Sequence, residues 1–128
     1  FLIVGDGPSR PDFELLAADL DLEQHVQFLG SRHDIPEIQA LSDVVCLAST
    51  DVESAPICML EALASGRPQV ATSIGGIPKI VADGETGFLA PPGDVPALAQ
   101  PSPAFCPMMN WQTACARHLV HGRSSNSR

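Results

Sequence analysis

Between residues 1 and 90 the chain alternates short apolar runs of β type with stretches of helical periodicity. This alternation predicts a parallel sheet with helices on both of its faces, because each strand needs a crossover helix to reach its parallel neighbour. Runs such as Val44 to Leu47 are apolar throughout, which is typical of strands buried on both sides. The fold class is therefore α/β, with strands expected at residues 1–4, 26–29, 44–48, 69–72 and 88–90.

Helical patterns occupy the first two segments between these strands. Residues 10–21 carry apolar side chains at i, i+3, i+4 and i+7, with Ser9 as a candidate N-cap. A shorter pattern over residues 34–41 has Pro36 in its first turn, where proline is tolerated. We expect a helix over each segment. The apolar stripe of the first helix consists of Phe13, Leu16, Ala17 and Leu20.

The third helix has the best-defined ends in the sequence. It begins at Pro56 and stops before Gly66, since proline is favoured in the first turn of a helix and glycine just past its end. A further helix is expected near residues 78–82, followed by a turn over residues 83–87. The apolar stripe of the third helix is expected to consist of Ile57, Leu60, Leu63 and Ala64.

The composition changes after about residue 100. The last segment contains several prolines, three arginines and no acidic residue, and it lacks a clear hydrophobic period. For residues 101–128, disorder and loose packing both stay open as interpretations. We therefore expect residues 1–100 to form one domain and residues 101–128 to form an atypical tail.

Charge limits the partners of the chain. All 15 acidic residues precede residue 95, and the formal net charge is −8. Nucleic acids and anionic membranes need a basic surface, so neither is expected as a partner. No apolar run approaches the ~20 residues needed to span a bilayer, so no transmembrane segment is expected. The four cysteines lack CxxC spacing, which favours packed, reduced thiols in a cytoplasmic protein and no metal site.

Two glutamates with seven residues between them are the main candidate site. Pro56 places Glu53 in the loop before a helix, and Glu61 lies about one and a half turns along that helix. Carboxylates accept hydrogen bonds from neighbouring hydroxyl groups, so such a pair can hold two ends of a polyhydroxyl ligand. On spacing alone, a solvated surface pair is the commoner explanation.

Residues 53–68 resemble the Glu-x7-Glu signature of family-4 (group 1) retaining glycosyltransferases, including its continuation as Glu-Ala-x-Ala-x-Gly-x-Pro. The resemblance covers about residues 1–99. It implies a Rossmann-like parallel sheet, as the incomplete C-terminal, donor-binding domain of the GT-B fold. The other matching blocks, in the order of the family, are FLIVGDGP (1–8), VQFLG (26–30), SDVV (42–45), GGIP (75–78) and DGETGFLAPPGD (83–94).

The resemblance implies a role for each glutamate. Glu53 matches the residue that contacts the hydroxyls of the donor sugar, and it is the catalytic candidate. Glu61 matches the residue that binds the ribose hydroxyls of the nucleotide. Backbone N–H groups after the first glutamate hold the phosphates in such enzymes, and since proline has no N–H group, the donors would be those of Ser54, Ala55 and Ile57.

Glycines and a loop complete the candidate site. Gly75 and Gly76 follow a strand, where two interpretations stay open, close approach to the donor or a purely structural turn. Gly5 and Gly7 lack the third glycine of a dinucleotide fingerprint and are interpreted as a strand-to-helix turn. The loop over residues 30–35 matches the segment that lines the base, against the alternative of a solvated turn. Its candidate residues are Gly30, Arg32, Asp34 and Ile35.

The resemblance implies transfer of a hexosyl unit, with retention, from a UDP- or GDP-type sugar to a hydroxyl acceptor, with no cofactor besides this donor. In the family, an arginine, a lysine and an N-terminal acceptor domain precede the first matching block, so we expect weak nucleotide binding and negligible transfer by this chain alone. The alternatives are a nucleotide-sugar epimerase and a non-catalytic binding or interaction module. We also expect self-association through an exposed sheet edge at residues 1–4.

Overall fold

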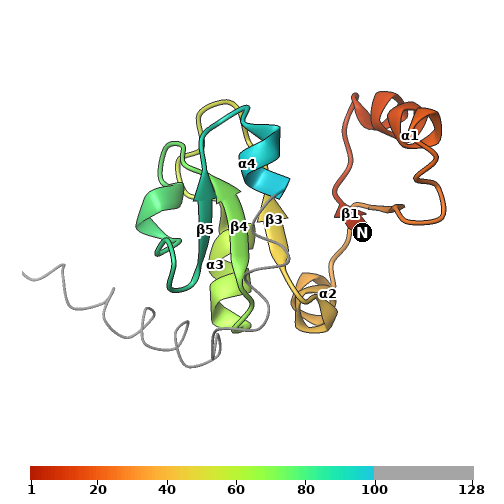
Figure 1. Cartoon of the computed structure of the whole chain (residues 1–128). Coiled ribbons are helices and arrows are strands. Elements are labelled where there is room, and N and C mark those ends of the chain that lie inside the picture. The colour runs from red at the N-terminus through yellow and green to blue at the C-terminus, as the bar shows by residue number, and fades with distance from the viewer. Residues whose placement is uncertain (100–128) are drawn as a thin grey trace, which may run out of the picture. The chain divides into compact units, whose positions relative to one another are not determined.

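The computed structural model describes residues 1–99 as an alternation of strands and helices (Figure 1). Each expected strand is present, with its ends shifted by no more than one residue. The expectations for residues 101–128 lie outside the described residues. The strands are β1 (Leu2–Val4), β2 (Gln27–Gly30), β3 (Val45–Leu47), β4 (Gln69–Thr72) and β5 (Gly87–Ala90). The helices are α1 (Arg10–Asp19), α2 (Ile35–Leu41), α3 (Ile57–Ala64), the 3-10 helix η1 (Ile77–Lys79) and α4 (Val95–Ala99).

The chain divides into two compact units, of which the first is Phe1–Ile35 and the second begins at Pro36. In the first unit, β1 pairs with β2. In the second, the strand order is β3-β4-β5. Every one of these pairings is parallel, so the α/β class with parallel strands is confirmed, and the described strands are divided between two sheets.

The first unit buries little apolar surface. All three residues of β1 are exposed, and on α1 only Ala17 is buried. The helix expected over residues 10–21 is present, but its apolar stripe is largely uncovered, since Phe13, Leu16 and Leu20 are each more than half exposed. Helical periodicity identifies an apolar face, but it does not provide the surface that covers it, and a two-stranded sheet covers little.

The second unit has its core around β4, the central strand of its sheet. All four residues of β4, including the polar Gln69 and Thr72, are buried, because β4 is the central strand of its sheet. Helix α3 contacts β3 and β4, and α4 contacts β4 and β5. The buried cluster consists of Met59, Ala71, Ile77, Ile80 and Val81, with Val45, Leu47, Cys58, Ile74 and Leu89 packed against it.

The buried face of α3 differs from the expected one. Leu63 is buried as expected, but Ile57, Leu60 and Ala64 are exposed. The other buried residues of α3 are Met59 and Ala62. Residues 57–60 are all apolar, so the pattern alone does not specify which side of the helix faces the sheet.

Two short helices also depart from the prediction. The helix expected near residues 78–82 is the 3-10 helix η1, which is three residues long. Helix α4 has five residues and was not predicted, because so short an element shows no measurable period.

Gln69 gives a test of the packing around β4. Its side chain is fully buried, and neither its oxygen nor its nitrogen has a hydrogen-bond partner among the described residues. A buried polar group left without a partner costs about 1–3 kcal/mol. We expect the Gln69→Leu variant, which is similar in volume, to raise the free energy of unfolding by about 1–2 kcal/mol in a urea titration.

The matched control for this prediction is Gln39→Leu. Gln39 is also buried, but its side-chain nitrogen donates to the Cys58 carbonyl at 2.9 Å, so its replacement removes a bond that exists. We expect this control to be neutral or destabilised. A Gln69→Leu protein that unfolds at lower urea than the original chain would contradict the prediction.

Candidate functional site

The loop that carries Glu53 leaves the sheet of the second unit at the carboxyl end of β3. Gly75 and Gly76 follow the neighbouring strand, β4. Because β3 and β4 run parallel, both segments leave the same edge of the sheet. Ligands of open α/β sheets bind at this edge, outside the carboxyl ends of the strands. The structure therefore brings together, from separate parts of the sequence, two segments that were predicted to bind the donor.

Hydrogen bonds hold Glu53 through both its backbone and its side chain. The Ser49 hydroxyl donates to Glu53 Oε1 at 2.9 Å, and the Gly76 N–H donates to the Glu53 carbonyl at 2.8 Å. The Thr72 hydroxyl, at the end of β4, donates to the Ser49 carbonyl at 2.6 Å. Neither Ser49 nor Thr72 was predicted to belong to the site. Their contacts join residues 4 and 23 positions apart, and no periodic pattern reveals such contacts.

Gly75 and Gly76 lie against the backbone of the Glu53 loop. A Cβ atom on Gly75 would lie 2.8 Å from the Glu53 carbonyl carbon, and one on Gly76 would lie 2.9 Å from that of Ser54. The carbonyl oxygens would be closer still, so there is no room for a side chain at either position. The packing of the Glu53 loop therefore explains why both positions are glycine. Direct contact of these glycines with a donor stays a prediction.

Glu61 lies on α3, in the same unit as Glu53, and both side chains are half-buried. The helix begins after Pro56, which is its N-cap, so the predicted start is confirmed to within one residue. The residues predicted to offer backbone N–H groups, Ser54, Ala55 and Ile57, are all exposed around this end of the helix. That exposure is what a contact with a phosphate would require, and the contact itself stays a prediction.

The predicted base loop lies in the first unit. Gly30 ends β2, and its carbonyl accepts a hydrogen bond from the Gly5 N–H at 2.9 Å. Arg32 donates to both oxygens of the Asp34 carboxylate, at 2.8 and 2.6 Å. This hydrogen-bonded pair holds the pKa of Asp34 below its ordinary value. Asp34 therefore stays ionised at lower pH than an ordinary aspartate. A nucleotide base that reached this loop would meet a carboxylate already paired with Arg32.

Ile35 is the last residue of the predicted base loop, and it begins α2. It is half-buried, as is Asp34. Like Gly30, Arg32 and Asp34, it stays a predicted contact of the base.

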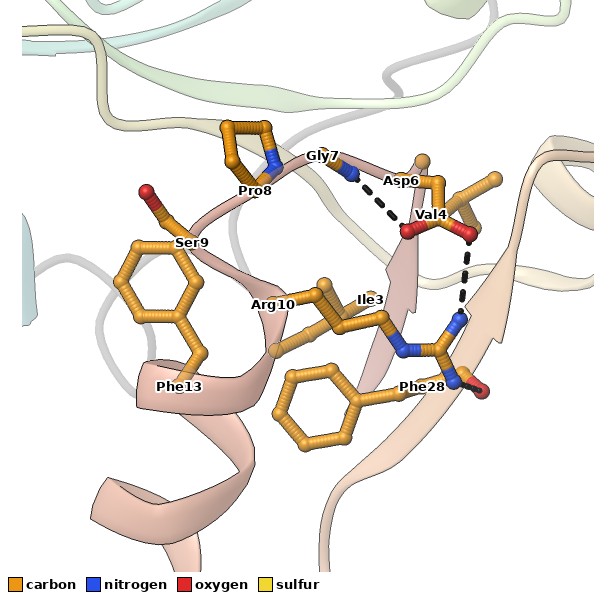
Figure 2. A pocket seen from close by; sticks show the side chains of 10 residues that line it. Ile3, Val4, Asp6, Gly7, Pro8, Ser9, Arg10, Phe13 and Phe28 are labelled. Carbon is orange, nitrogen blue, oxygen red and sulfur yellow. Dashed lines mark hydrogen bonds and ion pairs between the residues drawn. The ribbon is translucent and has the colours of Figure 1, made fainter.

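A hollow of about 230 Å³ lies at the turn between β1 and α1 in the first unit (Figure 2). Arg10 crosses it, donating to Asp6 at 3.4 Å and to the Phe28 carbonyl at 3.4 Å, and it also pairs with Glu14 at 2.7 Å. The hollow is lined by Ile3, Val4, Gly5, Asp6, Gly7, Pro8, Ser9, Arg10, Phe13 and Phe28.

The backbone of this turn supports its interpretation as a strand-to-helix connection. Gly5 has a φ of +126°, which glycine adopts without strain. The Gly7 N–H donates to the Asp6 carboxylate at 2.9 Å, so it already has an acceptor. A carboxylate in this position also disfavours a phosphate, because like charges repel.

Two cysteines belong to the described residues, and both are free thiols. Cys58 is half-buried, and burial raises the pKa of its thiol. Cys46 is exposed, so the expectation that it is packed is wrong; it lies on β3, an edge strand of its sheet. Within residues 1–99, no group of three or more His, Cys, Asp or Glu side chains could hold a metal ion. None of the helices in this part of the chain is long and apolar enough to cross a membrane.

Parallel strands joined by helices define the class of this protein, which has the fold of the GT-B glycosyltransferases. The crystal structure of Anabaena HepE in complex with UDP matches it with a TM-score of 0.82 and 31% identity, over 94% of this chain and 35% of that one. A glycosyltransferase from Rickettsia africae matches with a TM-score of 0.83 and 28% identity, with the same shares covered. The chain belongs to the group 1 glycosyltransferases, since the model of the family described as "Glycosyl transferases group 1" matches residues 1–101.

Curated relatives agree with this family. The N-acetyl-alpha-D-glucosaminyl L-malate synthase of Bacillus anthracis is 40% identical over 98 residues, which are 77% of this chain and 26% of that protein. The alpha-D-kanosaminyltransferase of Streptomyces kanamyceticus is 39% identical over 101 residues, with the same shares covered. The chain thus spans about a quarter of the length of these relatives. The family expected from the Glu-x7-Glu block is confirmed.

Proposed function

We propose that this chain is the donor-binding part of an enzyme that transfers a hexosyl unit, with retention, from a UDP- or GDP-type sugar to a hydroxyl acceptor. Membership of the group 1 glycosyltransferases supports the transferase class. Anabaena HepE has been crystallised in complex with UDP and with UDP-glucose, which supports a nucleotide sugar as the ligand. The observation that carries the proposal is the fixed position of the Glu53 loop at the carboxyl edge of β3 and β4, directly before the helix of Glu61.

Each acidic residue has a separate role in this proposal. Glu53 accepts hydrogen bonds from hydroxyls of the donor sugar and is the catalytic candidate, while Glu61 accepts them from the ribose. Ionised carboxylates suit this task because they only accept hydrogen bonds, and a sugar offers pairs of neighbouring hydroxyl donors. In the proposal, the N–H groups of Ser54, Ala55 and Ile57 hold the phosphates at the positive end of α3.

The charge of the donor's pyrophosphate needs positive groups beside it. Transfer from a nucleotide sugar leaves negative charge on the leaving group, which positive groups stabilise in the transition state. Two of the cations in residues 1–99, Arg10 and Arg32, are already paired with carboxylates. We therefore propose that residues 1–100 act as a donor-binding domain in the cytoplasm, and that an N-terminal acceptor domain of a longer protein is needed for full activity.

A Glu61→Ala variant tests the nucleotide site. We expect it to weaken the binding of UDP or GDP by roughly 10- to 100-fold in isothermal titration calorimetry, because hydrogen bonds to a charged carboxylate are lost. Glu85→Ala is the matched control, since it removes the same charge from an exposed turn of the same unit, and it should bind as the original chain does.

The outcomes separate the proposal from its rivals. Unchanged nucleotide affinity in Glu61→Ala would contradict the role of Glu61. Absence of binding to UDP, GDP and their sugars would leave a non-catalytic module. Interconversion of the donor's sugar epimers, followed by NMR, would identify an epimerase instead.

We also propose that the chain associates with itself through β1. This strand has one hydrogen-bonded neighbour among the described residues, β2, and all its side chains are exposed. An apolar strand with an open edge is a template for pairing with another chain. Sedimentation velocity should detect dimers or larger species that increase with concentration, and a monomer at every concentration would exclude this association.

A further inference from the structure

Two hydrogen bonds that share Ser49 connect the core of the second unit to the carboxylate of Glu53. It begins at Thr72, which is 2% exposed at the end of β4, and passes to the Ser49 carbonyl at 2.6 Å. From there the Ser49 hydroxyl reaches Glu53 Oε1 at 2.9 Å. The position of this carboxylate therefore depends on a serine that the buried strand holds in place.

The backbone of Glu53 is held independently. Its carbonyl accepts the Gly76 N–H at 2.8 Å, so the loop is fixed on the side of the segment after β4. This bond fixes the backbone at position 53 but leaves the side-chain torsions of Glu53 undetermined. Ser49 is the residue whose side chain bonds to that carboxylate, and this bond selects one rotamer from several.

A hydroxyl group suits this task better than a cation would. An ionised carboxylate offers about four lone-pair sites, and Ser49 uses one of them. Because serine is neutral, it orients the carboxylate and leaves its negative charge intact for the hydroxyls of a sugar. A lysine or arginine in this position would compete with the ligand by forming an ion pair.

We propose that Ser49 is a positioning residue, which orients the Glu53 carboxylate for the sugar of a nucleotide-sugar donor. This inference rests on the proposed role of Glu53. It makes Ser49 responsible for the higher affinity for a nucleotide sugar than for the nucleotide without its sugar. Ser49 acts through Glu53, so its loss should change the binding of the sugar part of the donor and leave the binding of the nucleotide part unchanged.

The experiment compares UDP-glucose with UDP as probes of the full chain, by isothermal titration calorimetry. The readout is the ratio of the affinities for UDP-glucose and UDP. A general loss of stability lowers both affinities by the same factor, so it does not change this ratio. We expect Ser49→Ala to reduce the preference for UDP-glucose by roughly fivefold to tenfold, with the Kd for UDP unchanged within about twofold. Ser49→Thr retains the hydroxyl and should restore the preference. In a Glu53→Gln background, Ser49→Ala should cause little further loss.

The same variants separate this inference from the proposed function. If Glu53→Gln keeps the full preference for UDP-glucose, the proposed role of Glu53 fails, and the role of Ser49 fails with it. If Glu53→Gln loses the preference while Ser49→Ala keeps it, only the inference about Ser49 is overturned.

A measurement without ligand separates orientation of the Glu53 carboxylate from anchoring of the Glu53 loop. In the original chain, the Gly76 amide should exchange slowly with deuterium, because it donates to the Glu53 carbonyl. Ser49→Ala should leave this exchange unchanged within about twofold, since the backbone bond to Glu53 does not involve the Ser49 hydroxyl. Ser49→Thr should exchange at the original rate, as should the nearby control Ser73→Ala, which changes an exposed serine. A roughly tenfold faster exchange at Gly76 in Ser49→Ala would overturn the inference, because Ser49 would then anchor the loop and not only orient the carboxylate.

Discussion

A Gly76→Ala protein is expected to lose at least tenfold in affinity for UDP-glucose and about 1–3 kcal/mol in its free energy of unfolding. The added Cβ atom would lie 2.9 Å from the Ser54 carbonyl carbon and closer to its oxygen. Both are backbone atoms, so no side chain can rotate away to relieve the contact. The Glu53 loop has to move, and the bond from the Gly76 N–H to the Glu53 carbonyl is lost with it.

The cause of this effect is steric and does not involve backbone strain. Gly76 has a φ of −85°, which alanine adopts without cost. Calorimetry with UDP-glucose and a urea titration measure the two losses. Gly7→Ala is the control, because a Cβ atom there meets no heavy atom within 4 Å, and it should behave as the original chain does. Wild-type binding and stability in Gly76→Ala would contradict the tight packing between the two loops.

A Met59→Ala variant is expected to destabilise the second unit by about 2–5 kcal/mol. Met59 is fully buried on α3 and belongs to the core cluster beneath the sheet. Its truncation removes apolar contacts and leaves a cavity, which the surrounding side chains fill only in part. Because small domains are stable by only about 5–15 kcal/mol, this loss is a large fraction of the total.

Unfolding by urea, followed by far-UV circular dichroism, measures this loss. Leu60→Ala is the matched control, since Leu60 is the next residue of the same helix and is 43% exposed. It should cost less than about 1 kcal/mol. Equal losses at the two positions would contradict the orientation of α3 in the structure, in which Met59 faces the core.

The site can be predicted from the sequence only in part. The Glu53 to Glu61 spacing and its helix start at Pro56 were visible because they lie within nine consecutive residues. Ser49 and Thr72 were not recognised, because their contribution arises from one hydrogen bond within the Glu53 loop and one between this loop and the end of β4. For Gly75 and Gly76, the sequence left a ligand contact and a structural turn open, and the structure adds their packing against the Glu53 loop.

By itself, the sequence determined the order and type of the larger elements, since β-type runs, helical periods and the Pro56 and Gly66 boundaries are local properties of the chain. It also determined the family, because ordered blocks of matching residues are read without knowledge of the fold. Only the tertiary structure decided which face of α3 is buried, which strands share a sheet, and how Glu53 is held. These features depend on contacts between segments that are distant in the sequence, and such contacts are set by the packing of the whole unit, which no single stretch of residues encodes.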